Sequence, residues 1–533
     1  MNIFNKIRHS RILRKQSVTE ATLIIIIITF LSKIVGYARE VLVANYFGAT
    51  AQTDAFLIAM LVPAMILGLI AGGLQAVIIP IYTERKKKDP AQARIFVNQV
   101  FFITVLFLLA LSIIMFIFPA FFIKAVAYGF KGDRLSLAVY FMRFLIIFGF
   151  FNVLVGFLTG LYHAEKQFLY PATLGLIGNS LIPLSLFFLH SPLGINSWTV
   201  GELAFSSFLF FSLFIVLFLR RNFFRVLQLN NVDWPSMRHF GALLLPIIAI
   251  SGISVINRVV DKTVASSLAA GSIAILNFAQ KVYLIPLGLF AMPLAVAVYP
   301  TFSSLATEKN YKGYAETFKQ SMSFMIYLMI PISVIFITLS QPIVRILFQH
   351  GAFTGSDTVV TAFAVSMYSL GLFALAANDI LRRSFFSFQD TKTPLYLSII
   401  IVAINIIGNL ILSRILGAGG IALATAIAAT TGLFLYAYAL RKKQYIKGLR
   451  YMPLLKEGIK IIAISIFIGF LSISLKPYLN ASPNFIISVV RFALVLLLLT
   501  AAYIPLTYLF KSYGYFIFIS RLKSFIKRFV YKK

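Results

Sequence analysis

Three charged residues lie inside the first apolar segment of the chain, where ionised groups are costly. The apolar run Leu23–Leu31 is followed by Lys33, Arg39 and Glu40, and further apolar residues come after them. Ionised side chains at the centre of a bilayer usually face a partner or a water-filled cavity. We expect these basic groups to line such a cavity and to meet an anionic ligand there. The alternative is an internal Lys33–Glu40 arrangement, with Arg39 reaching outward to the membrane surface.

Two further basic residues interrupt later apolar segments. Lys281 is followed by three prolines at seven-residue spacing (Pro286, Pro293 and Pro300), which should kink or break the helix that carries it. Irregular backbone at membrane depth is tolerated only where protein or a cavity covers it. Lys281 could therefore approach the same central space as Arg39. Arg143 lies about nine residues inside another apolar segment, and it suits a cavity lining and a surface position equally well.

An asparagine pair gives a weaker candidate site. Asn405 and Asn409 are four residues apart, so they share one face of a helix. Such pairs usually hold membrane helices together, and a monovalent-cation site is the alternative.

Recognisable catalytic chemistry is missing from the sequence. No GxxxxGK[ST] phosphate loop occurs, and the five histidines are scattered, so we expect no metal site and no cofactor. The acids Asp133, Glu202 and Asp357 are far apart and form no paired-carboxylate motif for hydrolysis or glycosyl transfer. The chain also has no cysteine, which excludes disulfides and thiolate chemistry. We therefore expect a transporter rather than an enzyme.

The composition predicts an all-α polytopic membrane protein. Of the 533 residues, 60% are hydrophobic, and apolar stretches of about 20 residues recur along the whole chain. We predict fourteen transmembrane helices joined by short connections. The net charge of +32 does not indicate nucleic-acid binding, because the basic residues fall in alternate loops.

The distribution of basic residues predicts the topology. Of the 48 Lys and Arg, 35 fall on one side of the predicted spans and 7 on the other. The positive-inside rule then places both termini in the cytoplasm. The basic N-terminus, residues 1–19, and the tail, residues 512–533, both look interfacial. In the tail, aromatic and basic residues alternate at helical spacing, which suits a helix on an anionic leaflet and makes anionic lipids a predicted partner.

An internal repeat divides the predicted spans. The interval from Pro63 to Pro286 equals the interval from Pro171 to Pro394, and each pair has matched surroundings. The dipeptide Gly178-Asn179 also recurs as Gly408-Asn409. We therefore predict two pseudo-symmetric six-helix lobes, residues 20–222 and 237–441, followed by a two-helix segment at residues 456–511. An even number of spans per repeat keeps both lobes in the same orientation across the membrane.

Several motifs resemble the MurJ/MviN family of lipid II flippases, in the multidrug/oligosaccharidyl-lipid/polysaccharide exporter superfamily. The resemblance covers essentially the whole chain. It rests on the segments SKIVGYARE, NYFGATAQTDAF, QKVYLIPLG and LRRSFFSFQDTKTP, which begin at Ser32, Asn45, Gln280 and Leu381. It implies V-shaped, MATE-like lobes around a central cationic cavity that receives a diphosphate-sugar headgroup. It also implies that residues 456–511 form a groove for the polyprenyl tail.

The resemblance also implies a function and a set of site residues. The function is translocation of a polyprenyl-diphosphate-linked saccharide, most simply the peptidoglycan precursor lipid II, to the outer leaflet of the bacterial cytoplasmic membrane. Another lipid-linked glycan is the nearest alternative, and a MATE-type cation-coupled drug exporter is a more distant one. Membrane potential or a monovalent cation would supply the energy, and cell-wall synthesis enzymes are candidate partners. The substrate-binding residues that it implies are Arg39, Lys33, Lys281 and Glu40. Arg143 joins this set on its position within an apolar segment alone, and Asn405 and Asn409 are the candidate cation site.

Two positions depart from the family pattern. The segment after Pro63 reads AMILGLI, whereas well-known members carry an arginine there. Residues 243–257 contain no acid to complete a sodium site with the asparagine pair.

Overall fold

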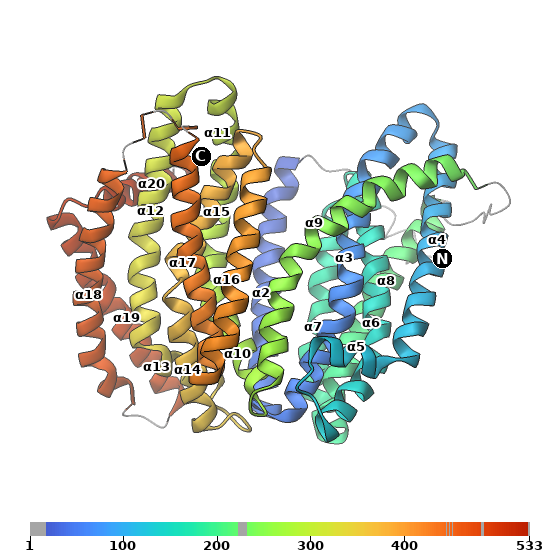
Figure 1. Cartoon of the computed structure of the whole chain (residues 1–533), viewed down its shortest axis with the longest axis horizontal. Helices are drawn as coiled ribbons and strands as arrows, with labels where there is room; N and C mark the ends of the chain where they lie inside the picture. The colour runs from blue at the N-terminus through green and yellow to red at the C-terminus, as the bar shows by residue number, and fades with distance from the viewer. Residues whose placement is uncertain are drawn as a thin grey trace. The chain divides into compact units, whose positions relative to one another are not determined.

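A computed structural model describes residues 18–221, 232–443, 445–446, 448–449, 451–480 and 484–530, and every regular element in these ranges is a helix (Figure 1). The predicted N-terminal segment, residues 1–19, lies almost wholly outside them. The first unit of the chain contains α2 (Val18–Phe47), α3 (Ala51–Lys88), α4 (Pro90–Ile117), α5 (Pro119–Val126), α6 (Gly132–Ala164), α7 (Leu169–Leu193), α8 (Asn196–Arg221) and α9 (Trp234–Ser266). The second contains α10 (Ser272–Pro286), η2 (Leu287–Ala291), α11 (Met292–Thr307), α12 (Tyr311–Thr338), α13 (Ser340–Phe348), α14 (Gly355–Ser369), α15 (Leu372–Ser387), α16 (Lys392–Leu416), α17 (Ala418–Lys442), α18 (Met452–Asn480), α19 (Phe485–Leu509) and α20 (Tyr513–Val530).

The helices are long and apolar enough for a polytopic membrane protein, which confirms the predicted class. Among the described residues, eleven helices could cross a membrane, or twelve if α14 and α15, bent by 40° at their junction, form one span. The helices α2 and α9 are outside this count, although they have 30 and 33 residues. At a rise of about 1.5 Å per residue, either helix is longer than the hydrocarbon core is thick. The total of fourteen spans stays a prediction.

Polar residues at the connections explain where several helices begin. The Asp89 carboxylate accepts hydrogen bonds from the backbone N–H groups of Ala91 and Gln92, and Pro90 starts α4 without a donor to lose. Thr354 and Asp357 form a capping box at the start of α14. In a chain this apolar, such caps and the short connections separate one helix from the next.

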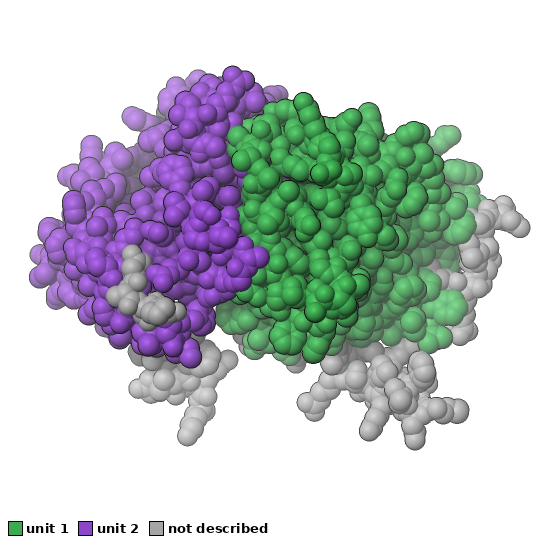
Figure 2. Space-filling view, turned by 90° about the horizontal axis from the view of Figure 1, so that it is seen from below, with its two compact units in different colours: residues 1–271 green, residues 272–533 purple. Residues whose placement is uncertain are grey.

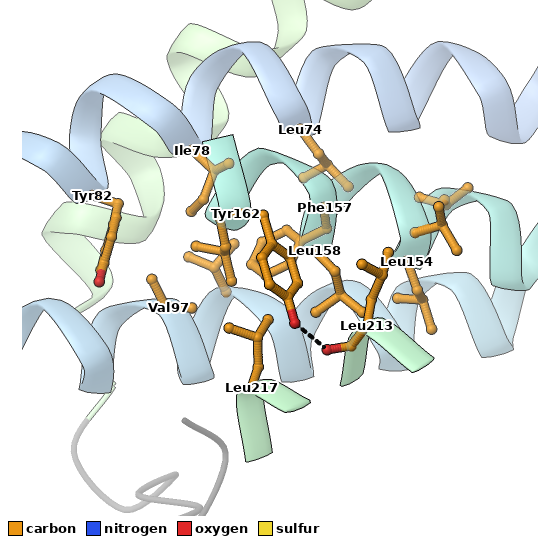
Figure 3. Close-up of a cluster of buried hydrophobic side chains, with 14 of the residues drawn as sticks. Leu74, Ile78, Tyr82, Val97, Leu154, Phe157, Leu158, Tyr162, Leu213 and Leu217 are labelled. Atoms are coloured by element: carbon orange, nitrogen blue, oxygen red, sulfur yellow. Dashed lines mark hydrogen bonds between the residues drawn. The ribbon is translucent and has the colours of Figure 1, made fainter. Parts of the chain in front are cut away.

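The chain divides into two compact units, residues 1–271 and 272–533, which Figure 2 distinguishes by colour. Helix α9 therefore belongs to the first unit by its packing, whereas the predicted second lobe begins at residue 237. Within the first unit, α3, α4, α6 and α8 share a hydrophobic core (Figure 3). There the buried Tyr162 donates a hydrogen bond from its hydroxyl to the Leu213 carbonyl at 3.0 Å, so its polar atom is satisfied.

The interval between the paired prolines reappears in helix boundaries. Helix α7 spans Leu169–Leu193 and α16 spans Lys392–Leu416, so both ends are offset by that same interval. The glycines that follow, Gly194 and Gly417, have matching φ values of 52° and 57°. This register makes one part of the repeat prediction wrong. The dipeptides Gly178-Asn179 and Gly408-Asn409 are separated by a longer interval, and they lie about two helical turns out of register.

A buried carboxylate joins three connections of the first unit. Asp54, fully buried near the start of α3, accepts a hydrogen bond from the Gly271 N–H at 2.8 Å. It also pairs with the Arg134 guanidinium at 3.1 Å, and Arg134 donates in turn to the Leu268 carbonyl at 3.3 Å. Gly271 has a φ of 89°, and a Cβ there would lie 2.1 Å from the Ala49 carbonyl oxygen. Asp54 therefore holds these connections together.

Replacing Asp54 with alanine should lower the free energy of unfolding by about 3 kcal/mol, because Arg134 loses its buried partner. Thermal unfolding of the purified protein in detergent measures this loss. Glu84→Ala is the matched control, since the Glu84–Lys88 pair is exposed and contributes little to stability. Equal unfolding midpoints for the two variants would contradict the assigned role.

Candidate functional site

The Arg39 guanidinium lies between two carboxylates in the first unit. Its Nη2 is 3.0 Å from Glu40 Oε1, and its Nη1 is 3.4 Å from Glu202 Oε1 on α8. The Arg39 side chain is only 18% exposed, and those of Glu40 and Glu202 are 3% and 1% exposed. Two buried acids thus hold one arginine in place, which satisfies the requirement that buried charges be paired.

Helix α8 positions the second acid through its tryptophan. The Trp198 Nε1–H, one turn before Glu202, donates a hydrogen bond to the same Oε1 at 3.1 Å. The Trp198 ring stacks on Phe56 of α3 with ring centroids 4.0 Å apart. The indole is therefore fixed on one side by packing and on the other by the carboxylate. We call Arg39, Glu40 and Glu202 the Arg39 cluster.

Two other predicted basic residues of the first unit lie apart from these contacts. Lys33 is exposed on α2, nearly two turns before Arg39. Arg143 is exposed on α6, and its guanidinium carbon lies 5.8 Å from the centroid of the Phe116 ring of α4. The third member of the Arg39 cluster is therefore the acid Glu202, and neither Lys33 nor Arg143 belongs to the cluster.

Lys281 lies in the second unit, on a helix with the predicted irregularity. It is half-buried on α10, beside Gln280, which donates to the Tyr368 hydroxyl at 3.1 Å. After Pro286 the backbone forms the π-helical turn η2, and α11 begins at Met292. This confirms the predicted break, since the prolines remove donors from the regular ladder. That Lys281 and Arg39 serve one cavity stays a prediction, because they belong to different units.

The asparagine pair joins α16 to α17. Asn409 donates from Nδ2 to Asn405 Oδ1 at 3.0 Å, and Asn405 donates from Nδ2 to Thr425 Oγ1 at 3.3 Å. Both asparagines are buried, with exposed fractions of 1% or less. Interhelical bonds of this kind stabilise helix packing. No cluster of three His, Cys, Asp or Glu residues suited to a metal ion occurs among the described residues.

Glu202 is the site residue that the sequence reasoning missed. The sequence alone groups it with Asp133 and Asp357, as one of several isolated acids. Two signals point to it: Glu202 interrupts an apolar helix, and a tryptophan stands four residues before it. Neither signal identifies Arg39 as the partner of Glu202, because Arg39 and Glu202 are 163 residues apart.

The family model "Lipid II flippase MurJ" matches residues 43–490, which is most of the chain. The chain belongs to the MurJ lipid II flippase family. The members of this family are transporters rather than enzymes. By family, the chain is also a multi-pass protein of the cytoplasmic membrane.

Individual relatives agree with this assignment. A protein of Rickettsia prowazekii described as "Probable lipid II flippase MurJ" is 28% identical over 429 residues, which cover 79% of this chain and 83% of the relative. A solved structure of "Lipid II flippase MurJ, inward closed conformation" is 28% identical, with a TM-score of 0.73, covering 90% of this chain and 98% of that one. An inward-facing multidrug resistance MATE transporter of the MOP superfamily, at 15% identity and a TM-score of 0.65 over 78% of this chain and 95% of its own, shows the fold alone.

Replacing Arg39 with methionine should destabilise the first unit by about 3 kcal/mol, because Glu40 and Glu202 lose a buried cation. Adding Glu202→Gln to that variant should recover part of the loss, since one of the uncompensated charges is removed. Thermal unfolding of the wild type, both single variants and the double variant gives the coupling energy between Arg39 and Glu202. Strictly additive effects would show that the two side chains do not interact.

Proposed function

We propose that this protein translocates lipid II, the undecaprenyl-diphosphate-linked peptidoglycan precursor, from the inner to the outer leaflet by alternating access. The observation that carries the proposal is the buried Arg39 cluster in a chain of the MurJ family. A diphosphate is costly to move through hydrocarbon unless cations accompany it. Arginine is suited to this task because its planar fork binds phosphate oxygens in pairs.

Arg39 would act by exchanging partners. In the structure its two terminal nitrogens face Glu40 and Glu202, which keep the guanidinium oriented while no substrate is bound. A diphosphate entering the cavity competes with these carboxylates for the same N–H groups. Glu40 and Glu202 therefore limit how tightly the substrate is held, and they recapture Arg39 when it leaves.

The remaining site residues have supporting roles in this proposal. Lys281 supplies a second cation, which binds phosphate as a point charge rather than as a fork. Lys33 and Arg143 add positive potential along the path, and residues 456–511 hold the polyprenyl tail. Membrane potential, at about 2.3 kcal/mol per charge per 100 mV, would drive the return of the emptied cationic cavity. A monovalent cation bound near Asn405 and Asn409 is the other coupling scheme.

The proposal also includes a topology of fourteen membrane spans. Counting α2 and α9 as spans, together with α14 and α15 as one, extends the twelve-span count to fourteen. Two six-helix lobes, residues 20–222 and 237–441, would then form a V with the substrate path between them. Both termini would be cytoplasmic, as the excess of basic residues on that side predicts.

Cells depleted of their own lipid II flippase should grow when they express this protein. Arg39→Ala and Lys281→Ala should each abolish rescue, because the cavity loses a cation that the diphosphate needs. Arg39→Lys should rescue poorly, since a lysine cannot form the two parallel hydrogen bonds. Growth after depletion, with immunoblots of membrane fractions to equalise the amount of protein, is the measurement.

Lys88→Ala is the matched control, because Lys88 is an exposed cation that pairs with the neighbouring Glu84. Rescue by the alanine variants at wild-type levels would rule out the cationic-cavity mechanism. Membrane expression of the wild type without rescue would favour a flippase for another polyprenyl-diphosphate-linked glycan. The segment after Pro63, which lacks an arginine, is the feature that favours this second candidate.

A further inference from the structure

The basic C-terminal helix α20 is docked on the second unit through a buried carboxylate. Glu457, near the start of α18, is 5% exposed. Its Oε1 accepts hydrogen bonds from the Ser512 hydroxyl at 2.5 Å and from the Gly514 N–H at 2.9 Å. Gly514 packs so closely on α12 that a Cβ there would lie 2.5 Å from Tyr327 Cβ. The first turn of α20 is thus fixed by contacts that a free tail would lack.

Aromatic contacts continue this docking along α12. Phe518 lies with its ring centroid 5.7 Å from that of Tyr327 and 6.4 Å from that of Phe324. One turn later, the Arg521 guanidinium carbon lies 5.3 Å from the centroid of the Phe324 ring. At the other end of the contact, the Tyr513 hydroxyl donates to Glu316, and Lys319 Nζ lies 4.2 Å from the centroid of the Tyr513 ring.

These contacts place α20 at the edge of the apolar layer. The part of α12 that touches Tyr513 carries Glu316 and Lys319, whereas the part that touches Phe518 belongs to the apolar stretch beyond. A helix that crosses another helix where charged residues give way to apolar ones is at the depth of the lipid headgroups.

The charge of α20 is complementary to an acidic membrane surface. Residues 512–533 combine aromatic and aliphatic side chains with basic ones, among them Arg521 and Lys523, and contain no acid. Arg521 and Lys523 are exposed, and so is the Phe516 ring, at 48%. An amphipathic helix of this composition binds a membrane through its apolar face and acidic headgroups through its basic residues.

We propose that α20, held by Glu457, is a binding surface for the headgroups of anionic phospholipids in the leaflet beside the α19–α20 turn. The bound lipids steady α20 against α12 and α18, two long helices of the second unit. This function is independent of the transported substrate. It makes the behaviour of the second unit depend on the acidic lipid content of its own membrane.

The test uses the full-length protein with one spin label. Since the chain has no cysteine, Ser520→Cys introduces a single attachment site on an exposed residue of α20. The labelled protein in neutral detergent is titrated with short-chain phosphatidylglycerol or phosphatidylcholine, and label mobility is recorded. Phosphatidylglycerol should immobilise the label and phosphatidylcholine should not. Replacing the basic residues of α20 with glutamine should raise the half-saturating phosphatidylglycerol concentration at least about tenfold; these residues are Arg521, Lys523, Lys527 and Arg528.

A control with the same loss of charge elsewhere should respond like the wild type; it replaces Lys87, Lys88, Lys309 and Lys442, all exposed, with glutamine. A second variant, Arg521→Lys with Lys523→Arg, keeps the charge and should keep the response, which separates lost charge from a misfolded helix. Equal responses to the two lipids, or an unchanged response after the α20 charges are removed, would overturn the proposal. Displacement of phosphatidylglycerol by equimolar inorganic diphosphate would also overturn it, because the surface would then be a diphosphate site.

Discussion

A guanidinium inside an apolar helix bundle has to be solvated by the protein itself, and much of the first unit can be understood from that requirement. Arg39 is paired with Glu40 on its own helix and with Glu202 on α8. Glu202 in turn accepts a hydrogen bond from Trp198, whose ring packs on α3. The charge on one residue of α2 thereby sets constraints on two other helices. Each of those constraints would be unnecessary if residue 39 were apolar.

The predicted internal repeat pairs positions of the first unit with positions of the second. Helices α7 and α16 begin and end in register, and glycines of nearly equal φ follow both. Elsewhere the backbones of the two units differ. Helix α3 is continuous, whereas the π-helical turn η2 separates α10 from α11, and α6 is continuous, whereas α14 and α15 meet at a bend of 40°. The two units therefore differ both in where the backbone breaks and in individual polar residues.

Single-helix features could be predicted from the sequence, whereas contacts between distant segments could not. Apolar length predicted the membrane helices, and proline spacing predicted the break after Pro286 that appears as a π-helical turn. The Arg39–Glu202 contact joins residues 163 positions apart, and no local periodicity encodes it. The amphipathic tail was visible as a pattern, but its attachment to Glu457 depends on a loop conformation that positive φ at Lys511 helps to set. The dipeptide Gly408-Asn409 has the same two residues as Gly178-Asn179 but lies out of register with it, because a shared pair of residue types does not define register.

The repeat register also shows how the two units differ in electrostatics. Glu202 of α8 and Thr425 of α17 are separated by the same interval as the ends of α7 and α16, so the predicted repeat makes them equivalent positions. Glu202 accepts from a guanidinium, whereas Thr425 accepts from the Asn405 amide. A neutral cluster can be covered or wetted without the desolvation cost of ions, so its energy changes little when water approaches. The energy of the ionic cluster in the first unit, by contrast, does change when water approaches. Its stability depends on the carboxylates that pair with Arg39, and in the proposed mechanism a diphosphate that replaced them would change the energy of the protein around it.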